Sequence, residues 1–201
     1  MTKKTQKIGI FGGSFDPIHL GHLNLAETIL KQFELDRIIF IPCSQTPGKD
    51  SPKASNQDRI NMLKLTTQSN DKFSINLCEI ERSGVSYTID TLNELKAVYP
   101  NAEFYLIMSQ DQFNDFTTTW FEWQEILETA KLIVANRPGS TLYIAPILKK
   151  YISFGIIQLI QIDPYDISST KIRDLIRHKK EFKHLVPQLI ADYIKKHHLY
   201  L

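Results

Sequence analysis

The sequence predicts an α/β fold in which helices cover both faces of a doubly wound parallel sheet. Residues 7–11 and 37–41 are short apolar stretches rich in isoleucine, as in buried strands. Between them, apolar side chains recur at helical spacing from residue 19 to residue 33. Parallel strands need a crossover connection of this kind, so the segment is expected to form a strand–helix–strand unit.

The same alternation continues to the end of the chain. We expect a strand or strand pair at residues 73–80 and further strands at residues 103–108, 131–135 and 156–162. Helices are expected at residues 56–68, 87–98, 121–127, 141–151, 169–178 and 187–197. The pattern predicts one Rossmann-like domain over residues 1–201, with a helical C-terminal portion.

The composition is that of a globular protein and excludes several classes. Hydrophobic residues make up 42% of the chain and charged residues 23%, which argues against disorder. The net charge of +2 is too small to indicate binding to nucleic acid. Two distant cysteines and the lack of a long apolar stretch predict a cytoplasmic protein without disulfides or membrane spans.

The most informative segment follows the first strand and contains two glycines and two histidines. Gly12 and Gly13 lack Cβ atoms, so backbone N–H groups there can approach a phosphate. His19 and His22 are three residues apart and share one helix face. They fit surface histidines, metal ligands without an evident third partner, or donors to a phosphate. Only the last interpretation also explains the glycines.

Two motifs resemble one superfamily. The stretch GGSFDPIHLGH, residues 12–22, resembles the GG[ST]FDPxHxGH signature of the nucleotidylyltransferases, whose HxGH element binds a nucleotide triphosphate. The stretch ISSTKIR, residues 167–173, resembles their ISSTxIR motif and has the N-capping residues of a helix start. Along almost the whole chain the sequence is similar to the bacterial nicotinate-nucleotide adenylyltransferases.

The resemblance implies transfer of the adenylyl group of ATP to nicotinate mononucleotide, with Mg²⁺ on the triphosphate. The expected products are deamido-NAD and pyrophosphate, and small molecules are the only partners expected, not nucleic acid or membrane. Two alternatives stay open: nicotinamide mononucleotide as the acceptor, and a regulatory module that binds nucleotide without catalysis. The oligomeric state is also open.

The resemblance also implies a role for each motif residue. The catalytic residues would be His19 and His22, and no side chain is expected to ligate a metal. ATP would be bound by Gly12, Gly13, Ser14, Phe15, Lys49, Asp111, Ser169, Thr170 and Arg173. The mononucleotide would be bound by Tyr87, Thr88, Trp120 and Arg137, whereas Trp123, Phe116 and Phe121 are expected in the core.

Two positions depart from the family pattern. Gly48 stands where the family's PPH[KR] motif has histidine, and Ser109 stands where its GxD motif has glycine. Both departures concern loop geometry and leave HxGH and ISSTxIR intact.

Overall fold

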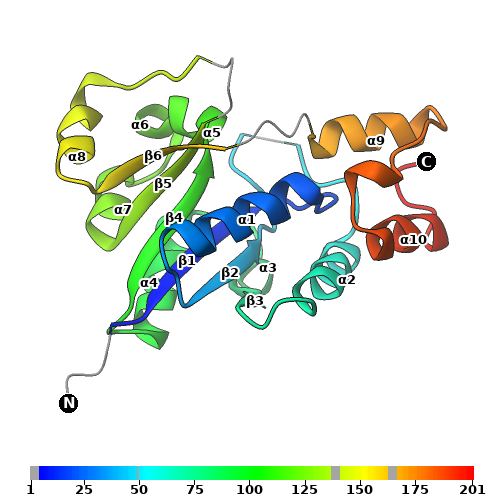
Figure 1. The fold of residues 1–201 in the computed structure, drawn as a ribbon, viewed down its shortest axis with the longest axis horizontal. Coiled ribbons are helices and arrows are strands. Elements are labelled where there is room, and N and C mark those ends of the chain that lie inside the picture. The colour runs from blue at the N-terminus through cyan, green and yellow to red at the C-terminus, as the bar shows by residue number, and fades with distance from the viewer. Residues whose placement is uncertain (1–4, 49, 137–140, 163–166) are drawn as a thin grey trace.

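The architecture is a six-stranded parallel sheet with helices on both faces (Figure 1). The computed structural model describes residues 5–48, 50–136, 141–162 and 167–201. The strand order is β3-β2-β1-β4-β5-β6, and all pairs are parallel. The strands are β1 (Lys7–Gly13), β2 (Arg37–Pro42), β3 (Phe73–Ile75), β4 (Glu103–Ser109), β5 (Ala130–Asn136) and β6 (Ile157–Gln161). The predicted doubly wound, Rossmann-like fold is confirmed.

The strand order reverses between β1 and β4, and the pairing of β1 is uneven there. β1 pairs with β2 as far as Gly13↔Pro42, but its pairing with β4 stops at Ile10↔Leu106. The last residues of β1 therefore diverge from β4 at the carboxyl edge of the sheet. In doubly wound sheets this reversal is where ligands bind.

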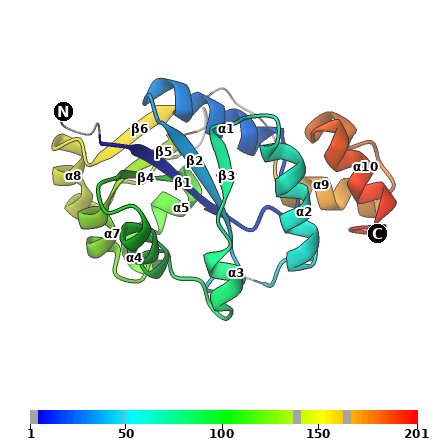
Figure 2. The same ribbon diagram turned by 90° about the horizontal axis from the view of Figure 1, so that it is seen from below.

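Each face of the sheet has its own apolar core. α1 (Leu20–Gln32), α2 (Asn56–Thr67), α9 (Ser169–Arg177) and α10 (Gln188–Lys196) pack on one face. α4 (Thr88–Val98), α5 (Gln110–Asn114), α6 (Phe116–Thr119), α7 (Trp123–Thr129) and α8 (Lys149–Ser153) belong to the other. Figure 2 shows α1 on one side of the sheet and α4 and α7 on the opposite side.

Alternation along the strands separates the two cores. In β2, Phe40 contributes to the core under α1, whereas Ile39 and Ile41 contribute to the core under α4. Gly9 of β1 is needed for close packing, since a Cβ there would lie 2.9 Å from side-chain atoms of Leu35 and Ile38. No described helix is both long enough and apolar enough to span a bilayer.

Two predicted elements on the α4 side were wrong in part. The strand predicted over 73–80 ends at Ile75, because the side chain of Asn76 accepts from the Cys78 N–H at 2.8 Å and turns the chain into α3 (Cys78–Arg82). The helix predicted over 121–127 begins only at Trp123, since Glu122 before it has a left-handed φ of 52°.

The helix predicted over 141–151 is also wrong in its first half. Residues 141–145 form no helix, and a 3₁₀ turn begins at Pro146 before α8. Proline disfavours helical geometry in the residue before it, and Ala145 accordingly has ψ 135°. Residues 110–119, for which no helix or strand was predicted, contain the short helices α5 and α6.

The helical C-terminal portion is confirmed. α9 is followed by a 3₁₀ turn, Lys183–Leu185, and by α10, which packs beside α2 (Figure 1). Tyr193 of α10 donates its hydroxyl to Asp58 of α2 at 2.9 Å and accepts from Asn61 at 2.9 Å. These contacts fix the C-terminal helices against the first half of the chain.

Candidate active site

The two motif histidines lie together at the start of α1. His19 is the N-cap residue, with an extended backbone, and His22 occupies the third helical position. Their rings stack with centroids 3.6 Å apart. His19 is buried, and Phe15 packs edge-on against His22 with centroids 5.2 Å apart. The predicted pairing of the two imidazoles is confirmed.

A reciprocal cap defines which ring nitrogens can donate. The Nδ1 atom of His19 accepts from the His22 N–H, and the Nδ1 atom of His22 accepts from the His19 N–H, each at 3.3 Å. A neutral imidazole whose Nδ1 accepts carries its proton on Nε2. Both rings are therefore arranged as Nε2–H donors, as stabilisation of a phosphate oxygen requires.

The turn after β1 is made by Phe15 and not by the glycines. β1 was expected to end at Phe11 but continues through Gly13, and Phe15 has the left-handed φ of 47°. A Cβ on Gly13 would lie 3.2 Å from the Phe15 ring, whereas a Cβ on Gly12 would meet no atom within 4 Å. Gly13 thus makes room for Phe15, and the space above Gly12 is open to a ligand.

A buried arginine holds the peptide between Ser14 and Phe15. Arg59 of α2 donates from Nη1 to the Ser14 carbonyl at 2.7 Å and from Nη2 to the Cys43 carbonyl at 2.8 Å. In a trans peptide the carbonyl and the following N–H point in opposite directions. Arg59 therefore turns the Phe15 N–H away from α2, in the orientation that an anion cradle needs.

Arg59 was missed in the sequence, although a signal for it was present. The side chain is fully buried, and its Nε has no hydrogen-bond partner in the described part of the chain. Arg59 shares the spacing of Met62, Leu63 and Thr66, all buried residues of α2. A charged residue in such a stripe indicates a tertiary role.

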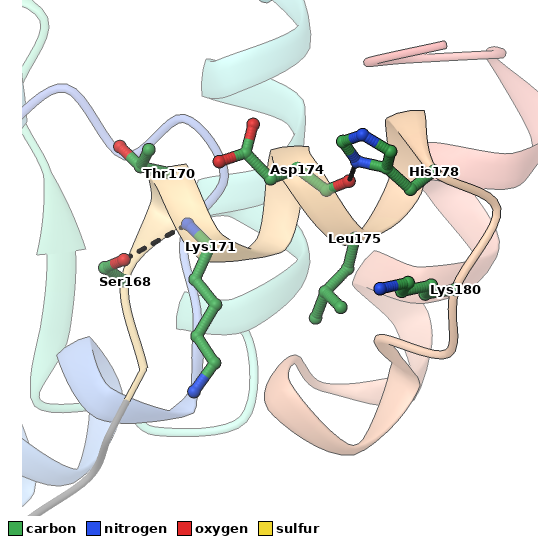
Figure 3. Close-up of a pocket in the computed structure, with 7 residues that line it drawn as sticks. All are labelled: Ser168, Thr170, Lys171, Asp174, Leu175, His178 and Lys180. Carbon is green, nitrogen blue, oxygen red and sulfur yellow. Dashed lines mark hydrogen bonds between the residues drawn. The ribbon is translucent and has the colours of Figure 1, made fainter.

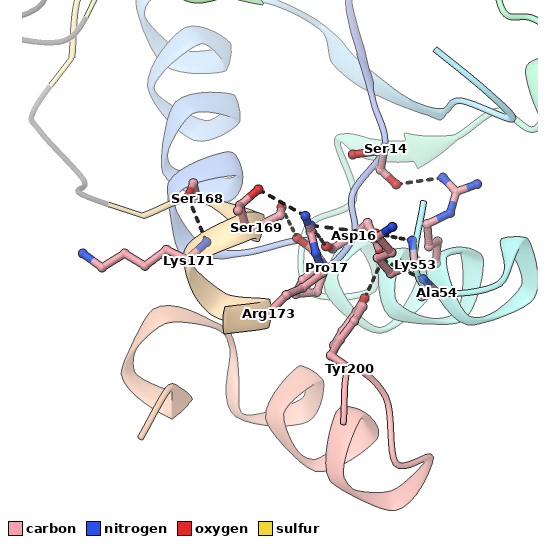
Figure 4. A network of polar contacts seen from close by, with 12 residues as sticks. Ser14, Asp16, Pro17, Lys53, Ala54, Ser168, Ser169, Lys171, Arg173 and Tyr200 are labelled. Carbon is pink, nitrogen blue, oxygen red and sulfur yellow. Dashed lines mark hydrogen bonds and ion pairs between the residues drawn. The ribbon is translucent and has the colours of Figure 1, made fainter. Parts of the chain in front are cut away.

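The start of α9 reaches the same loop. Ser168 caps the helix by accepting from the Lys171 N–H at 3.1 Å. Ser169 donates to the Pro17 carbonyl at 2.9 Å, and Arg173 donates from Nη1 to the Asp16 carbonyl at 2.7 Å (Figure 4). The predicted residues Ser169 and Arg173 are thus next to the histidine loop, where they hold its carbonyl groups.

Thr170 lies beside Arg173 at the exposed start of α9. Its hydroxyl accepts from the Arg173 Nη2 at 3.1 Å. This bond leaves the outer edge of the guanidinium near a hydroxyl that faces solvent. Thr170 is exposed, whereas the Arg173 side chain is 19% exposed, so the predicted role of both in binding phosphate stays a prediction.

Asp16 is a second residue that the sequence analysis overlooked. Its carboxylate is 2% exposed and accepts from the N–H groups of Lys53 and Ala54 at 2.7 and 3.0 Å. Asp16 therefore ties the loop after β1 to the loop before α2. Nothing local to the sequence indicates this bond, because its partners are 37 and 38 residues away.

A pocket of about 390 Å³ lies along the exposed side of α9 (Figure 3). Ser168 and Thr170 line one end, and Lys171, Asp174, Leu175, His178 and Lys180 line the rest. Neither histidine of the stacked pair lines it. Its charged lining mixes lysines with an aspartate, so it favours no particular ligand.

The start of α4 forms the other side of the candidate site. Tyr87 is the N-cap residue and Thr88 the first helical residue, and no side chain caps the N–H groups of the first turn. Ser86 fixes this start, because its hydroxyl accepts from the Ser44 N–H at 3.2 Å and its N–H donates to the Gln45 carbonyl at 2.9 Å. The first N–H groups of α4, at the predicted residues Tyr87 and Thr88, are therefore not used by a capping side chain.

A buried carboxylate supports this helix start from behind. Glu79 accepts from the Thr91 hydroxyl at 2.8 Å, and Arg82 donates to the same hydroxyl at 3.1 Å while pairing with Glu94. Burial raises the pKa of the Glu79 carboxyl, and hydrogen bonds from Thr91 and Ser86 oppose the rise.

The aromatic residues near Trp120 divide into core and surface. Phe116 and Trp123 are buried as predicted, but Phe121 is 56% exposed and was wrongly expected in the core. It pairs instead with the ring of Tyr87 at 5.1 Å between centroids. Trp120 is half-buried, against Phe116 at 5.5 Å, so part of its ring surface is accessible to a ligand.

The two departures from the family pattern have local explanations. Gly48 has a left-handed φ of 68°, a conformation that favours glycine. Ser109 caps α5 in a reciprocal arrangement with Gln112, and Asp111 follows it in an exposed position at the carboxyl edge of β4. Two predicted site residues, Lys49 and Arg137, lie outside the described residues.

Comparison with known proteins gives a consistent result. Residues 10–175 match the family described as cytidylyltransferase-like. A probable nicotinate-nucleotide adenylyltransferase of Dictyoglomus thermophilum is 39% identical over 97% of this chain and 100% of its own length. One of Aquifex aeolicus is 45% identical over 71% of this chain and 84% of its own length.

Solved structures agree with these relatives. A Plasmodium falciparum nicotinic acid mononucleotide adenylyltransferase, solved in complex with NaAD, superimposes with a TM-score of 0.78. The two chains are 26% identical, and the match covers 97% of each. The chain described here therefore belongs to the cytidylyltransferase-like family and, within it, to the nicotinate-nucleotide adenylyltransferases.

Proposed function

We propose that the protein transfers the adenylyl group of ATP to nicotinate mononucleotide and releases pyrophosphate. The product is deamido-NAD, an intermediate of pyridine-nucleotide biosynthesis. The observation that carries the proposal is the stacked pair of His19 and His22, with both Nε2 donors fixed by the reciprocal cap. The names of the relatives and the NaAD complex of the Plasmodium falciparum enzyme support the choice of substrates.

The reaction is an in-line displacement at phosphorus. An oxygen of the mononucleotide's 5′-phosphate attacks the α-phosphorus of ATP, a new P–O bond forms, and the bond to pyrophosphate breaks. No covalent enzyme intermediate is needed, so stabilisation of charge and alignment of the two phosphates supply the acceleration. His19 and His22 donate to the phosphate oxygens on which charge develops.

The ATP half combines the loop after β1 with the start of α9. Gly12 leaves open space beside the triphosphate and Gly13 makes room for Phe15, while Ser14 and Phe15 provide backbone N–H groups to the triphosphate. Further contacts come from the start of α9 and from two positions elsewhere: Ser169, Thr170, Arg173, Lys49 and Asp111. Because Ser169 and Arg173 already hold the Pro17 and Asp16 carbonyls, their main contribution is to fix the loop that leads to His19.

The mononucleotide half uses the uncapped start of α4. The N–H groups at Tyr87 and Thr88 bind the carboxylate of the pyridine ring, Trp120 stacks on that ring, and Arg137 pairs with the phosphate. Main-chain donors favour the acid over the neutral amide, so nicotinate mononucleotide is preferred to nicotinamide mononucleotide.

Mg²⁺ is the metal that we propose for the triphosphate. The described residues contain no cluster of three His, Cys, Asp or Glu side chains suited to a metal. The Asp16 carboxylate of the loop already accepts hydrogen bonds from Lys53, Ala54 and Tyr200. The ion would thus be held mainly by phosphate oxygens and water, where it neutralises charge on the triphosphate.

Two broader features belong to the proposal. Residues 1–201 are assigned to one nucleotidylyltransferase domain. Cys43 and Cys78 are both free thiols, which fits the reducing environment of a cytoplasmic enzyme.

Pyrophosphate release by the purified protein tests the proposal. ATP and Mg²⁺ are supplied with either nicotinate mononucleotide or nicotinamide mononucleotide, and release with the acid alone is expected. Equal or faster release with the amide would overturn the assigned acceptor. ATP binding without pyrophosphate release from either would favour a regulatory module instead.

A further inference from the structure

The penultimate residue of the chain contacts the loop that leads to the histidine pair. The Tyr200 hydroxyl donates to Oδ1 of Asp16 at 2.8 Å, across 184 residues of sequence. Figure 4 shows the Tyr200 side chain extending from the C-terminal tail to Asp16, beside Arg173. No predicted site residue lies in this tail, so the contact adds a segment to the site.

Asp16 brings together three segments of the chain at one carboxylate. The loop before α2 contributes the Lys53 and Ala54 N–H groups, and the tail contributes the Tyr200 hydroxyl. α9 contributes Arg173, whose Nη1 lies 3.8 Å from Oδ2 and donates to the main-chain carbonyl of Asp16 at 2.7 Å. Asp16 is three residues before His19, so its position determines where α1 begins.

The tail is fixed firmly enough to position Asp16. The Leu199 N–H donates to the Ile194 carbonyl at the end of α10 at 3.0 Å. Leu199 and Tyr200 also pack against the core under α1. Burial, together with the negative charge of Asp16, raises the pKa of the Tyr200 hydroxyl far above its usual range, so it remains a donor throughout the neutral range.

We infer that Tyr200 is a positioning residue for adenylyl transfer, because it holds Asp16 and thereby the loop from Ser14 to His19. The inference rests on the proposed function. Without this bond, Asp16 keeps its partners in the loop before α2 and in α9 but loses the tail. The loop then becomes more mobile, and the Nε2 donors of His19 and His22 move from the positions that the α-phosphate requires. Small displacements of such donors lower the rate strongly.

A second tyrosine provides a matched control. Tyr193 in α10 donates to Asp58 at 2.9 Å, again a phenol bound to a carboxylate in the C-terminal portion. That bond joins α10 to α2 and does not touch the loop after β1. Tyr200→Phe and Tyr193→Phe each remove one hydroxyl and keep the ring. Each loses one hydrogen bond to a carboxylate, and Tyr193→Phe also loses the bond from Asn61.

The two variants are compared with the wild type in steady-state kinetics and thermal unfolding. Both are expected to lose a similar, small amount of thermal stability. Tyr200→Phe is expected to lower kcat about tenfold and to raise KM for ATP, while KM for nicotinate mononucleotide stays near its wild-type value. Tyr193→Phe is expected to keep all three kinetic constants.

Two outcomes would overturn the inference. Wild-type kcat in Tyr200→Phe would mean that the bond does not act on the site, and equal kinetic losses in both variants would mean a general effect of stability. ATP-induced stabilisation against heat is measured in parallel, without the second substrate. A wild-type protein that binds ATP but releases no pyrophosphate would overturn the proposed function alone. In that case, weaker ATP-induced stabilisation in Tyr200→Phe alone would still support the positioning role of Tyr200. Equal ATP-induced stabilisation in Tyr200→Phe and Tyr193→Phe would refute it.

Discussion

The two halves of the candidate site are constructed differently. In the ATP half, Arg173 and Tyr200 reach Asp16 across 157 and 184 residues. In the mononucleotide half, Thr91 bonds to Glu79 and Arg82 across only 12 and 9 residues. The first half therefore depends on contacts across most of the chain, whereas the described contacts of the second are shorter in sequence, the bond from Ser44 to Ser86 spanning 42 residues.

The two halves also differ in exposure. His19 and Asp16 are almost fully buried, but Tyr87 and Phe121 are 37% and 56% exposed. Donors that stabilise a transition state must be held accurately, and buried cross-chain bonds provide that accuracy. Contacts to a planar ring tolerate more movement. The difference suggests that changes in the ATP half affect kcat, while changes in the mononucleotide half affect KM.

The largest effect is expected from the histidine pair. His19→Ala should lower kcat about 100- to 1000-fold while the protein still folds, because one phosphate donor is lost. Alanine also removes the helix cap, so His19→Asn is the sharper variant. Asparagine is a good N-cap whose side-chain oxygen can accept from the His22 N–H, but it has no donor at the Nε2 position. Both variants are measured for pyrophosphate release and for thermal unfolding.

A histidine outside the site serves as the control. His197 is exposed and stacks on Tyr193 with centroids 4.1 Å apart. His197→Ala should retain wild-type turnover. Near-native turnover in His19→Asn would refute the donor role, because the cap would then be the only contribution of His19.

Arg59 should give the next largest effect. It holds the Ser14 carbonyl in the ATP half and the Cys43 carbonyl, and the next residue, Ser44, donates to Ser86 at the start of α4. Arg59→Met leaves both carbonyls and the Asn56 side chain without their donor, a loss of about 3 kcal/mol in the free energy of unfolding. The Ser14–Phe15 peptide is then free to turn, so kcat should fall as well. Urea unfolding and steady-state kinetics measure the two losses.

Arg59→Lys separates charge from geometry. Lysine keeps the positive charge beneath the loop but cannot donate to three acceptors from a fixed plane. Compared with Arg59→Met, Arg59→Lys is expected to restore the affinity for ATP to a greater extent than it restores kcat. Full recovery of kcat in Arg59→Lys would show that charge alone matters and that the held peptide does not.

The sequence predicted most of the sheet because each strand is a short apolar run with its own turn signal. It predicted the histidine pair because two residues three apart at a helix start must be neighbours. It failed at 76–82 and 141–145, where an asparagine side chain and a proline redirect the chain. In both segments the chemistry of a single residue determined the backbone conformation, against the apolar pattern.

The sequence did not reveal Asp16 and Tyr200 for a different reason. Asp16 and Tyr200 act through partners more than 100 residues away or through loop amides, and no periodicity encodes such contacts. Arg59 is the exception, because its place in the buried stripe of α2 was readable. Sequence patterns thus identified the groups proposed to contact substrate more readily than the groups that hold them.

The smallest effect concerns the buried charge of Glu79. Because burial raises the pKa of its carboxyl above the ordinary 4.5, the folded protein binds more protons than the unfolded chain just above that pH. The contribution of Glu79 to stability is therefore highest in acid and falls as pH rises from 4.5 towards the raised pKa. Glu79→Gln should remove this fall, measured as the free energy of unfolding in urea at several pH values.

Glu103 offers the opposite case as a control. Burial tends to raise the pKa of its carboxyl, but hydrogen bonds from Lys131 and Tyr105 outweigh burial and lower it. Glu103 therefore stabilises the protein above pH 4.5, and Glu103→Gln should lose stability at neutral pH but not in acid. If Glu79→Gln showed the same sign as Glu103→Gln, Glu79 would be a stabilising anion. The mononucleotide half would then be held by charge pairing, as Glu103 is, and not by the hydrogen bonds of a buried carboxyl.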